Sequence, residues 1–284
     1  MQEPNPRTSR LVIAGGVAAV IVISGGGFLV GRATAPVPPA PPPVVIEPPT
    51  LLPVPEVRII RRRDLIALAE QAADAFASGK PLPASIRDAA GRHFELVLPI
   101  GCAGPSEPNS TLSMQWRYDE GEQALRVSVT PVTWRAAEWG FENSSGAAAA
   151  EGFWITRPWS ALETCAPHYA QATPAGVEPV TLSGQTLAVA QFVTDDAERN
   201  NRRIGNPFET VQRLPIDRID PQQGLRLRVK GRIARLPDNT PARCIQPGGP
   251  DQRPICVIGV RMDEITIENP ASEEALATWT LGRR

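Results

Sequence analysis

The feature that most constrains this chain is an uncharged run near its N-terminus. Residues Leu11 to Gly31 contain no charged side chain and only one polar side chain, that of Ser24. As a helix rising 1.5 Å per residue, the run would span about 31 Å, which matches a hydrocarbon core of about 30 Å. The sequence therefore predicts a transmembrane helix over residues 11–31, preceded by a tail of residues 1–10.

The alternative to a permanent anchor is a cleaved signal peptide. Ala33-Thr34-Ala35 has the small-residue form of a cleavage site. The apolar run is longer than the stretch of about 7–15 residues in a signal peptide, and Pro36 would distort the bond to be cut. We therefore expect an uncleaved, single-pass signal anchor. Arg7 and Arg10 before the span, against Arg32 after it, favour a cytoplasmic N-terminus. In a bacterial inner membrane, where we expect this anchor, the C-terminal region would then be periplasmic.

Small residues in this predicted span could bring two helices together. Gly27 and Gly31 form a G-x-x-x-G pair, which allows close approach of helix backbones. The pair makes a homodimer through the transmembrane helix one interpretation. The other is that glycine and alanine are simply frequent in membrane helices.

Residues 32–56 form a proline-rich linker. Between Pro36 and Pro55, 10 of 20 residues are proline and only Glu47 is charged. Such a segment predicts polyproline II structure at about 3.1 Å per residue, or roughly 60 Å in all, and hence a stiff spacer. A ligand for proline-binding domains is the alternative. Anchor and spacer together resemble Gram-negative envelope proteins that reach across the periplasm, although the span lacks the histidine of the energy transducers.

The charge balance of the chain excludes one class of partner. The sequence has 29 Lys and Arg residues against 30 Asp and Glu residues, a formal net charge of -1. A nucleic-acid binder would carry a basic footprint. We therefore expect no nucleic-acid partner.

The four cysteines, Cys102, Cys165, Cys244 and Cys256, predict two disulfides in an exported domain. Three pairings are open, and pairing of sequence neighbours would give each half of the region its own bridge. A zinc site is the rival, because Cys165 and His168 have C-x-x-H spacing, but no second close pair accompanies them. We expect neither a metal nor another cofactor.

The remaining sequence predicts a mainly β (α+β) region with a few short helices. A helix is expected over residues 64–78, and alternating apolar residues predict antiparallel strands in both halves. We expect two β-rich subdomains, residues 57–175 and residues 176–284. The second could be a small OB-like barrel. Asn269, Pro270 and the acids that follow predict a short C-terminal helix.

Tryptophans provide the candidate binding residues. Trp116 lies on the apolar face of its predicted strand and is expected in the core. Trp139, Trp154 and Trp159 stand among polar and turn residues, so they are expected to form a surface patch that stacks on sugar rings or anchors a partner. A tryptophan-rich core is the alternative.

Sequence signals for catalysis are few. The chain has two histidines, His93 and His168, and neither a G-x-S-x-G nor an H-E-x-x-H motif. We predict a non-enzymatic, membrane-anchored periplasmic protein whose disulfide-stabilised domain binds or scaffolds envelope partners. The alternatives are a cell-wall or polysaccharide binder that uses the tryptophans and, less favoured, a wall-modifying hydrolase.

Overall fold

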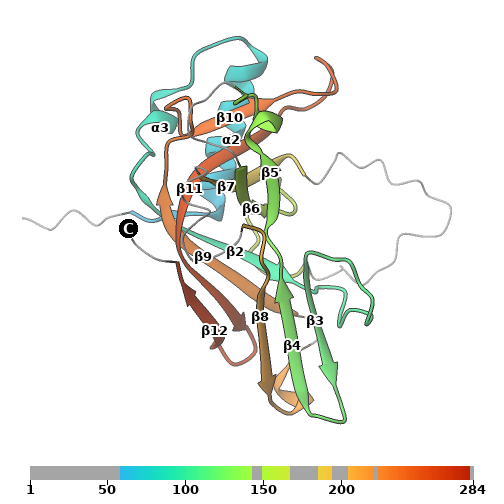
Figure 1. Ribbon diagram of the computed structural model, residues 1–284. Coiled ribbons are helices and arrows are strands. Elements are labelled where there is room, and N and C mark those ends of the chain that lie inside the picture. Colours follow the sequence, from blue (N-terminus) through green and yellow to red (C-terminus); the bar gives the residue numbers. More distant parts are fainter. Residues whose placement is uncertain (1–57, 143–148, 167–184, 194–203, 221–222, 282–284) are drawn as a thin grey trace, which may run out of the picture. The chain divides into compact units, whose positions relative to one another are not determined.

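Two β-sheets form the framework of the described part of the chain (Figure 1). The computed structural model describes residues 58–142, 149–166, 185–193, 204–220 and 223–281. The predicted tail, the predicted span with Gly27 and Gly31, and the linker of residues 32–56 lie outside these residues. Among the helices that are described, none combines the length and apolar character needed to cross a membrane.

The described strands follow the alternating apolar residues of the sequence. They are β1 (Ile60–Arg61), β2 (His93–Ile100), β3 (Met114–Asp119), β4 (Ala124–Val129), β5 (Val132–Arg135), β6 (Ala149–Trp154), β7 (Leu187–Val193), β8 (Phe208–Arg213), β9 (Leu225–Ile233), β10 (Ala242–Ile245), β11 (Ile255–Asn269) and β12 (Glu274–Thr280). The mainly β prediction is confirmed at this level.

Strand β11 is the centre of the larger sheet. That sheet has nine strands in the order β1-β2-β9-β11-β7-β6-β5, and β10 and β12 also pair with β11. The first part of β11 pairs with β7 and β10, and its second part pairs with β9 and β12. Two pairs, β1 with β2 and β7 with β11, are parallel. The smaller sheet has the order β3-β4-β8.

The division into subdomains at residues 175 and 176 differs from the structure. Residues Glu56–Arg284 form one compact unit. Strand β2 of the first half pairs with β9 of the second, and β6 of the first half pairs with β7 of the second. Backbone groups of β2 and β6 therefore find partners in the second half, so the two halves share one sheet.

The described strands of the second half do not form the expected OB-like barrel. A barrel requires the strands of that half to close on themselves. Instead, β8 belongs to the smaller sheet, where it pairs with β4 of the first half. Strand β9 has β2 as its other neighbour, so the second half does not close.

The predicted C-terminal helix is a strand. After β11 the chain turns at residues 270–273, where Glu273 has a left-handed φ of 55°. Strand β12 then returns along the edge of β11. Pairing with this otherwise open edge satisfies backbone groups, and Trp279 packs edge-on against Phe208 with ring centroids 5.3 Å apart. These tertiary contacts override the local helix signal.

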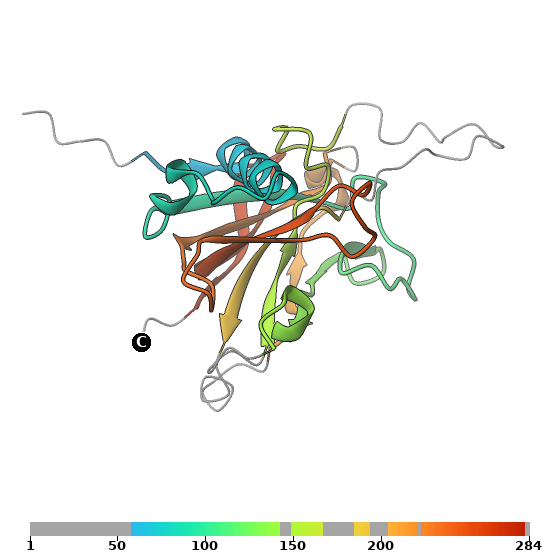
Figure 2. The same cartoon turned by 90° about the horizontal axis from the view of Figure 1, so that it is seen from above.

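Helix α2 (Arg62–Ala77) covers part of the larger sheet (Figure 2). Its buried residues, among them Leu65, Ile66 and Ala69, recur at helical spacing and pack in the main core. The Arg61 backbone N–H donates to the Asp64 carboxylate at 3.0 Å and satisfies one donor of the first turn. The short helix α3 (Ala84–Arg87) follows.

Both disulfides join sequence neighbours, Cys102 to Cys165 and Cys244 to Cys256. This outcome resolves the three pairings that the sequence left open. It also removes Cys165 as a zinc ligand, because its sulfur is bonded to the Cys102 sulfur. His168 lies outside the described residues.

Removing the Cys244–Cys256 disulfide should destabilise the domain by about 3 kcal/mol, since the bridge closes a loop of about 13 residues. The two cysteines face each other directly on β10 and β11 and both are buried, so alanine is the better replacement than serine. We expect the Cys244→Ala/Cys256→Ala variant of the full chain, in detergent micelles, to unfold at a lower urea concentration. An unchanged midpoint would contradict the expected role of the bridge.

Candidate binding site around Trp154 and Trp159

A pocket of about 290 Å³ lies where β3, β4, β5 and β6 approach the loop after β6. Its apolar lining comes from Met114, Val132, Phe153, Trp154 and Trp159. Its polar lining comes from Ser113, Thr130, Thr156, Arg157 and Gln185. The pocket is close to the lower size limit of about 300 Å³ for small-ligand sites and combines aromatic faces with a few polar groups, as such sites do.

The three predicted tryptophans do not form one surface patch. Trp159 is 60 % exposed, Trp154 is half-buried and Trp139 is only 2 % exposed. Trp154 and Trp159 line the same pocket, whereas Trp139 is not part of its lining. The prediction of a surface patch therefore fails for Trp139, and the core prediction for Trp116, which is 1 % exposed, agrees with the structure.

Trp139 is buried because one face of the larger sheet carries small side chains. Ala150, Ala188 and Ala190 leave space above the strands, and the 3₁₀ turn η1 (Ala136–Trp139) places Trp139 over them. The ring centroids of Trp134 and Trp139 lie 5.9 Å apart, and those of Trp134 and Trp154 lie 5.4 Å apart, both nearly perpendicular. Trp154 thus belongs both to this buried aromatic cluster and to the wall of the pocket.

The loop of residues 155–165, which we call the Trp159 loop, is fixed by a buried arginine. Arg62, the first residue of α2, is fully buried. Its Nε donates to the Ser160 carbonyl at 3.0 Å, and its Nη2 donates to the carbonyls of Arg157, at 3.2 Å, and of Thr156. Arg62 is the middle one of three consecutive arginines, Arg61 to Arg63. The sequence signal for its burial is spacing, because Arg62 lies three and four residues before the buried Leu65 and Ile66.

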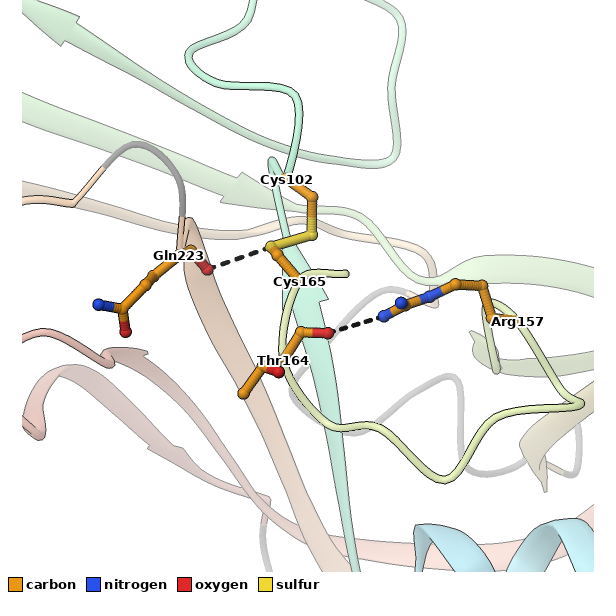
Figure 3. Close-up of a disulfide and its surroundings, with 5 residues drawn as sticks. All are labelled: Cys102, Arg157, Thr164, Cys165 and Gln223. Atoms are coloured by element: carbon orange, nitrogen blue, oxygen red, sulfur yellow. Dashed lines mark hydrogen bonds between the residues drawn. A yellow bond between two sulfur atoms is a disulfide. The ribbon is translucent and has the colours of Figure 1, made fainter. Parts of the chain in front are cut away.

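A disulfide fixes the far end of the Trp159 loop (Figure 3). Cys165 is bonded to Cys102, and its sulfur lies 3.1 Å from the Gln223 carbonyl oxygen. Within the loop, Arg157 Nη2 donates to the Thr164 carbonyl at 2.8 Å. Arg157 has a left-handed φ of 51°, a conformation that requires such support in a residue with a side chain. The exposed Trp159 therefore stands on a constrained loop.

Positive charge gathers at this loop. Burial and, after it, the charge of Arg157 lower the pKa of Arg62 to about 10, while the charge of Glu163 acts in the opposite direction. Of the described residues that line the pocket, only Arg157 is charged. The pocket thus presents two indole rings, hydroxyl and amide groups, and the cation of Arg157. A second cation, Arg62, contacts the backbone of the same loop.

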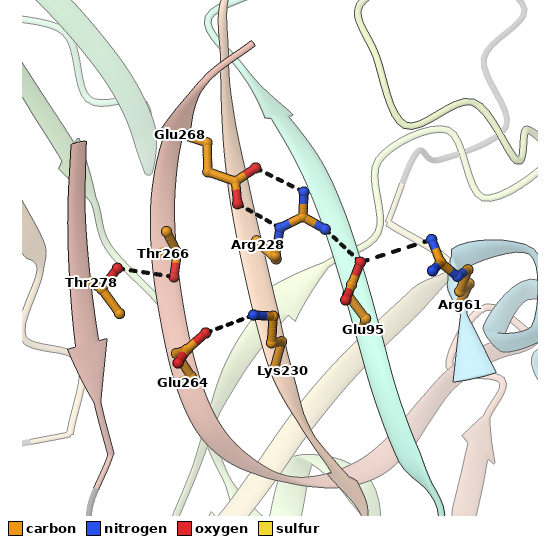
Figure 4. A network of polar contacts seen from close by, with 8 residues as sticks. All are labelled: Arg61, Glu95, Arg228, Lys230, Glu264, Thr266, Glu268 and Thr278. Atoms are coloured by element: carbon orange, nitrogen blue, oxygen red, sulfur yellow. Dashed lines mark hydrogen bonds and ion pairs between the residues drawn. The ribbon is translucent and has the colours of Figure 1, made fainter. Parts of the chain in front are cut away.

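The strongest polar network elsewhere is a ladder across β2, β9, β11 and β12 (Figure 4). Arg228 donates to both carboxylate oxygens of Glu268, at 2.5 and 2.8 Å, and also to Glu95. Lys230 pairs with Glu264 at 2.9 Å. Hydrogen bonding to Glu268, more than any other cause, raises the pKa of Arg228 above its usual range.

This ladder stabilises the sheet. Its charges alternate across neighbouring strands, as cross-strand pairs do in antiparallel sheets. A glycosidase needs one carboxyl group that carries a proton to the leaving group. Glu95 and Glu268 instead accept hydrogen bonds from the same guanidinium, so both carboxylates already serve the cross-strand ladder. We therefore place the candidate site at the Trp154–Trp159 pocket.

No family model matches this chain, and neither a curated protein nor a solved structure shows significant similarity to it.

Proposed function

We propose that this chain is a non-enzymatic binding protein of the bacterial cell envelope, tethered to the inner membrane by residues 11–31. Its folded domain would bind wall glycan in the periplasm through the Trp154–Trp159 pocket. The observation that carries the proposal is the pocket itself, in which an exposed tryptophan on a constrained loop faces a half-buried one among hydroxyl and amide groups.

The two disulfides support the proposed periplasmic location of the domain. Disulfides persist in oxidising environments such as the periplasm, and both bridges join parts of one β-rich domain. A linker of roughly 60 Å would place that domain away from the inner membrane, where the wall lies within reach.

The chemistry of the pocket supports a saccharide over a protein partner. A sugar ring presents C–H groups that stack on indole faces and hydroxyls that can hydrogen-bond to Ser113 and Thr130. A stable protein interface needs about 800 Å² from each partner. The pocket, at about 290 Å³, suits one ring or one side chain.

Replacing Trp159 by alanine should abolish sedimentation of the full-length protein with isolated wall material. The side chain is 60 % exposed, so the free energy of unfolding should change by less than about 0.5 kcal/mol. Phe76, an aromatic residue that is 42 % exposed and does not line the pocket, provides the matched control, Phe76→Ala. Sedimentation of the Trp159→Ala variant at the wild-type level would refute the proposed site.

Two further measurements separate this proposal from its alternatives. Crosslinking in intact cells followed by mass spectrometry would favour a scaffold for envelope proteins if discrete proteins are captured by the wild type and lost in the Trp159→Ala variant. A zymogram on wall substrate would favour the hydrolase if it shows clearing. We expect glycan attachment in the first experiment and no clearing in the second.

A further inference from the structure

Arg157 suggests which glycans the pocket selects, an inference that rests on the proposed glycan-binding function. Among the described lining residues it is the only charged one, and it is half-buried beside the two pocket tryptophans. Its described hydrogen bonds use one N–H group, the Nη2 donor to Thr164. The planar guanidinium of arginine can present two parallel donors to a carboxylate.

A second, independent observation points to an anion. Arg62 is fully buried behind the Trp159 loop, and its Nη1 has no hydrogen-bond partner within the described part of the chain. Its described contacts there are to neutral carbonyl oxygens of Thr156, Arg157 and Ser160. A buried cation of this kind is stabilised by a nearby negative charge. Glu163 supplies one such charge to Arg62, and a bound anion at Arg157 would add another.

The backbone of the loop keeps Arg157 in place. Arg157 has a left-handed φ, and its backbone carbonyl accepts a hydrogen bond from the Arg62 side chain. Its own side chain donates a hydrogen bond to the carbonyl of Thr164, which precedes the disulfide-bonded Cys165. Little side-chain freedom then remains to be lost when a ligand binds, which raises affinity. The cation and the aromatic faces are thus held together as one site.

We infer that the Trp154–Trp159 pocket selects saccharides that carry a carboxylate, with the ring stacked on the indoles and the carboxylate bound by Arg157. Two chemical sources of such a ligand are wall glycan freed of its stem peptides, whose muramic acid units then carry a free lactyl carboxylate, and polymers of uronic acids. The shared chemistry is a sugar ring with a carboxylate attached to it.

The test is isothermal titration of the full-length protein, in detergent micelles, with two matched pairs of probes. The first pair is a tetrasaccharide of N-acetylglucosamine and N-acetylmuramic acid with free carboxylates, and the same tetrasaccharide with carboxamides. The second pair is tetragalacturonate and its methyl ester. We expect at least one acid to bind about tenfold or more tightly than its neutral partner, as one charge-assisted contact would give. The preference should fall as salt is raised.

Variants make the inference specific to Arg157. Arg157→Gln should bind acid and neutral probe alike, while Arg117→Gln, at an exposed arginine outside the pocket, should keep the wild-type preference. Thermal unfolding of Arg157→Gln should match the wild type within a few degrees, which separates lost selectivity from lost folding.

The outcomes distinguish the two proposals. Equal binding of acid and neutral probes by the wild type, or a preference that survives in a folded Arg157→Gln variant, overturns the inference and leaves glycan binding standing. Absence of binding by every probe overturns the proposed function and the inference together.

Discussion

Replacing Trp139 by alanine is expected to lower the free energy of unfolding by about 3–5 kcal/mol, the usual cost of removing a large buried aromatic side chain. Trp139 is 2 % exposed and packs against Trp134 and Trp154, with ring centroids 5.9 and 6.4 Å away. The surrounding alanines cannot collapse into the space, so a cavity remains. Its Nε1 has no hydrogen-bond partner in the described residues, and the whole loss therefore comes from packing.

The measurement is urea unfolding of the full chain in detergent micelles, followed by tryptophan fluorescence. Trp139→Phe is the matched variant, because it keeps an aromatic ring and removes an unpaired buried N–H, and we expect it to cost less than half as much. Trp159→Ala should leave the unfolding midpoint unchanged. A Trp139→Ala variant that unfolds at the wild-type midpoint and no longer binds wall material would instead indicate that Trp139 takes part in binding.

Strand content was predictable here because half-buried strands leave a period of two in the sequence. Residues 94–100, 112–118 and 125–129 alternate, and β2, β3 and β4 follow them. The short strands β5 and β10 have four residues each, too few for a period to be recognised. Strand β12 was mistaken for a helix because its partner is the far end of β11, which local sequence does not indicate.

The joining of the two halves could not be predicted for a similar reason. Which strand pairs with which depends on long-range contacts, and neighbouring strands along the chain are only the commonest choice. Here β2 pairs with β9, across more than 120 residues, and β11 serves four partners in turn. The disulfides were easier, because only three pairings existed and neighbouring cysteines proved to be the pairs.

The site was predicted in part. Composition and neighbours placed Trp154 and Trp159 at the surface, and both line the pocket. The same reasoning failed for Trp139, because polar neighbours in the chain do not reveal an alanine-covered sheet face elsewhere. Arg157 was missed since its left-handed backbone and its place beside the pocket arise only from the folded loop.

Replacing Arg62 by alanine is expected to destabilise the domain by about 2–6 kcal/mol and to weaken glycan binding as well. The side chain makes three hydrogen bonds to buried carbonyl groups, each worth about 1.5–3 kcal/mol when the donor is charged. The cost of burying the charged guanidinium offsets part of the stabilisation that these hydrogen bonds give. The pKa of Arg62 is lowered from its ordinary value to about 10, chiefly by burial, which corresponds to a cost of about 3 kcal/mol.

The sign of that cost follows from proton linkage. Between pH 10 and 12.5 the unfolded chain holds the proton that the folded chain has released, so the contribution of Arg62 to stability rises with pH in this window. Below pH 10 both states are charged and the cost is present in full. The hydrogen bonds must exceed it for the buried arginine to stabilise the fold at neutral pH.

Arg62→Lys distinguishes the hydrogen bonds from the charge. Lysine keeps the charge but lacks the planar guanidinium that reaches the carbonyls of both Ser160 and Arg157. The Arg62→Lys variant should therefore be destabilised about as much as the alanine variant. The full chain would be measured by urea unfolding at pH 7, and wall sedimentation would be scored at low urea, where both variants remain folded. Because the same carbonyls hold the loop that carries Trp159, loss of sedimentation in folded Arg62→Lys protein would show that binding depends on a fixed loop. Wild-type stability and wild-type sedimentation in that variant would mean that the arginine fork neither stabilises the domain nor orders its binding site.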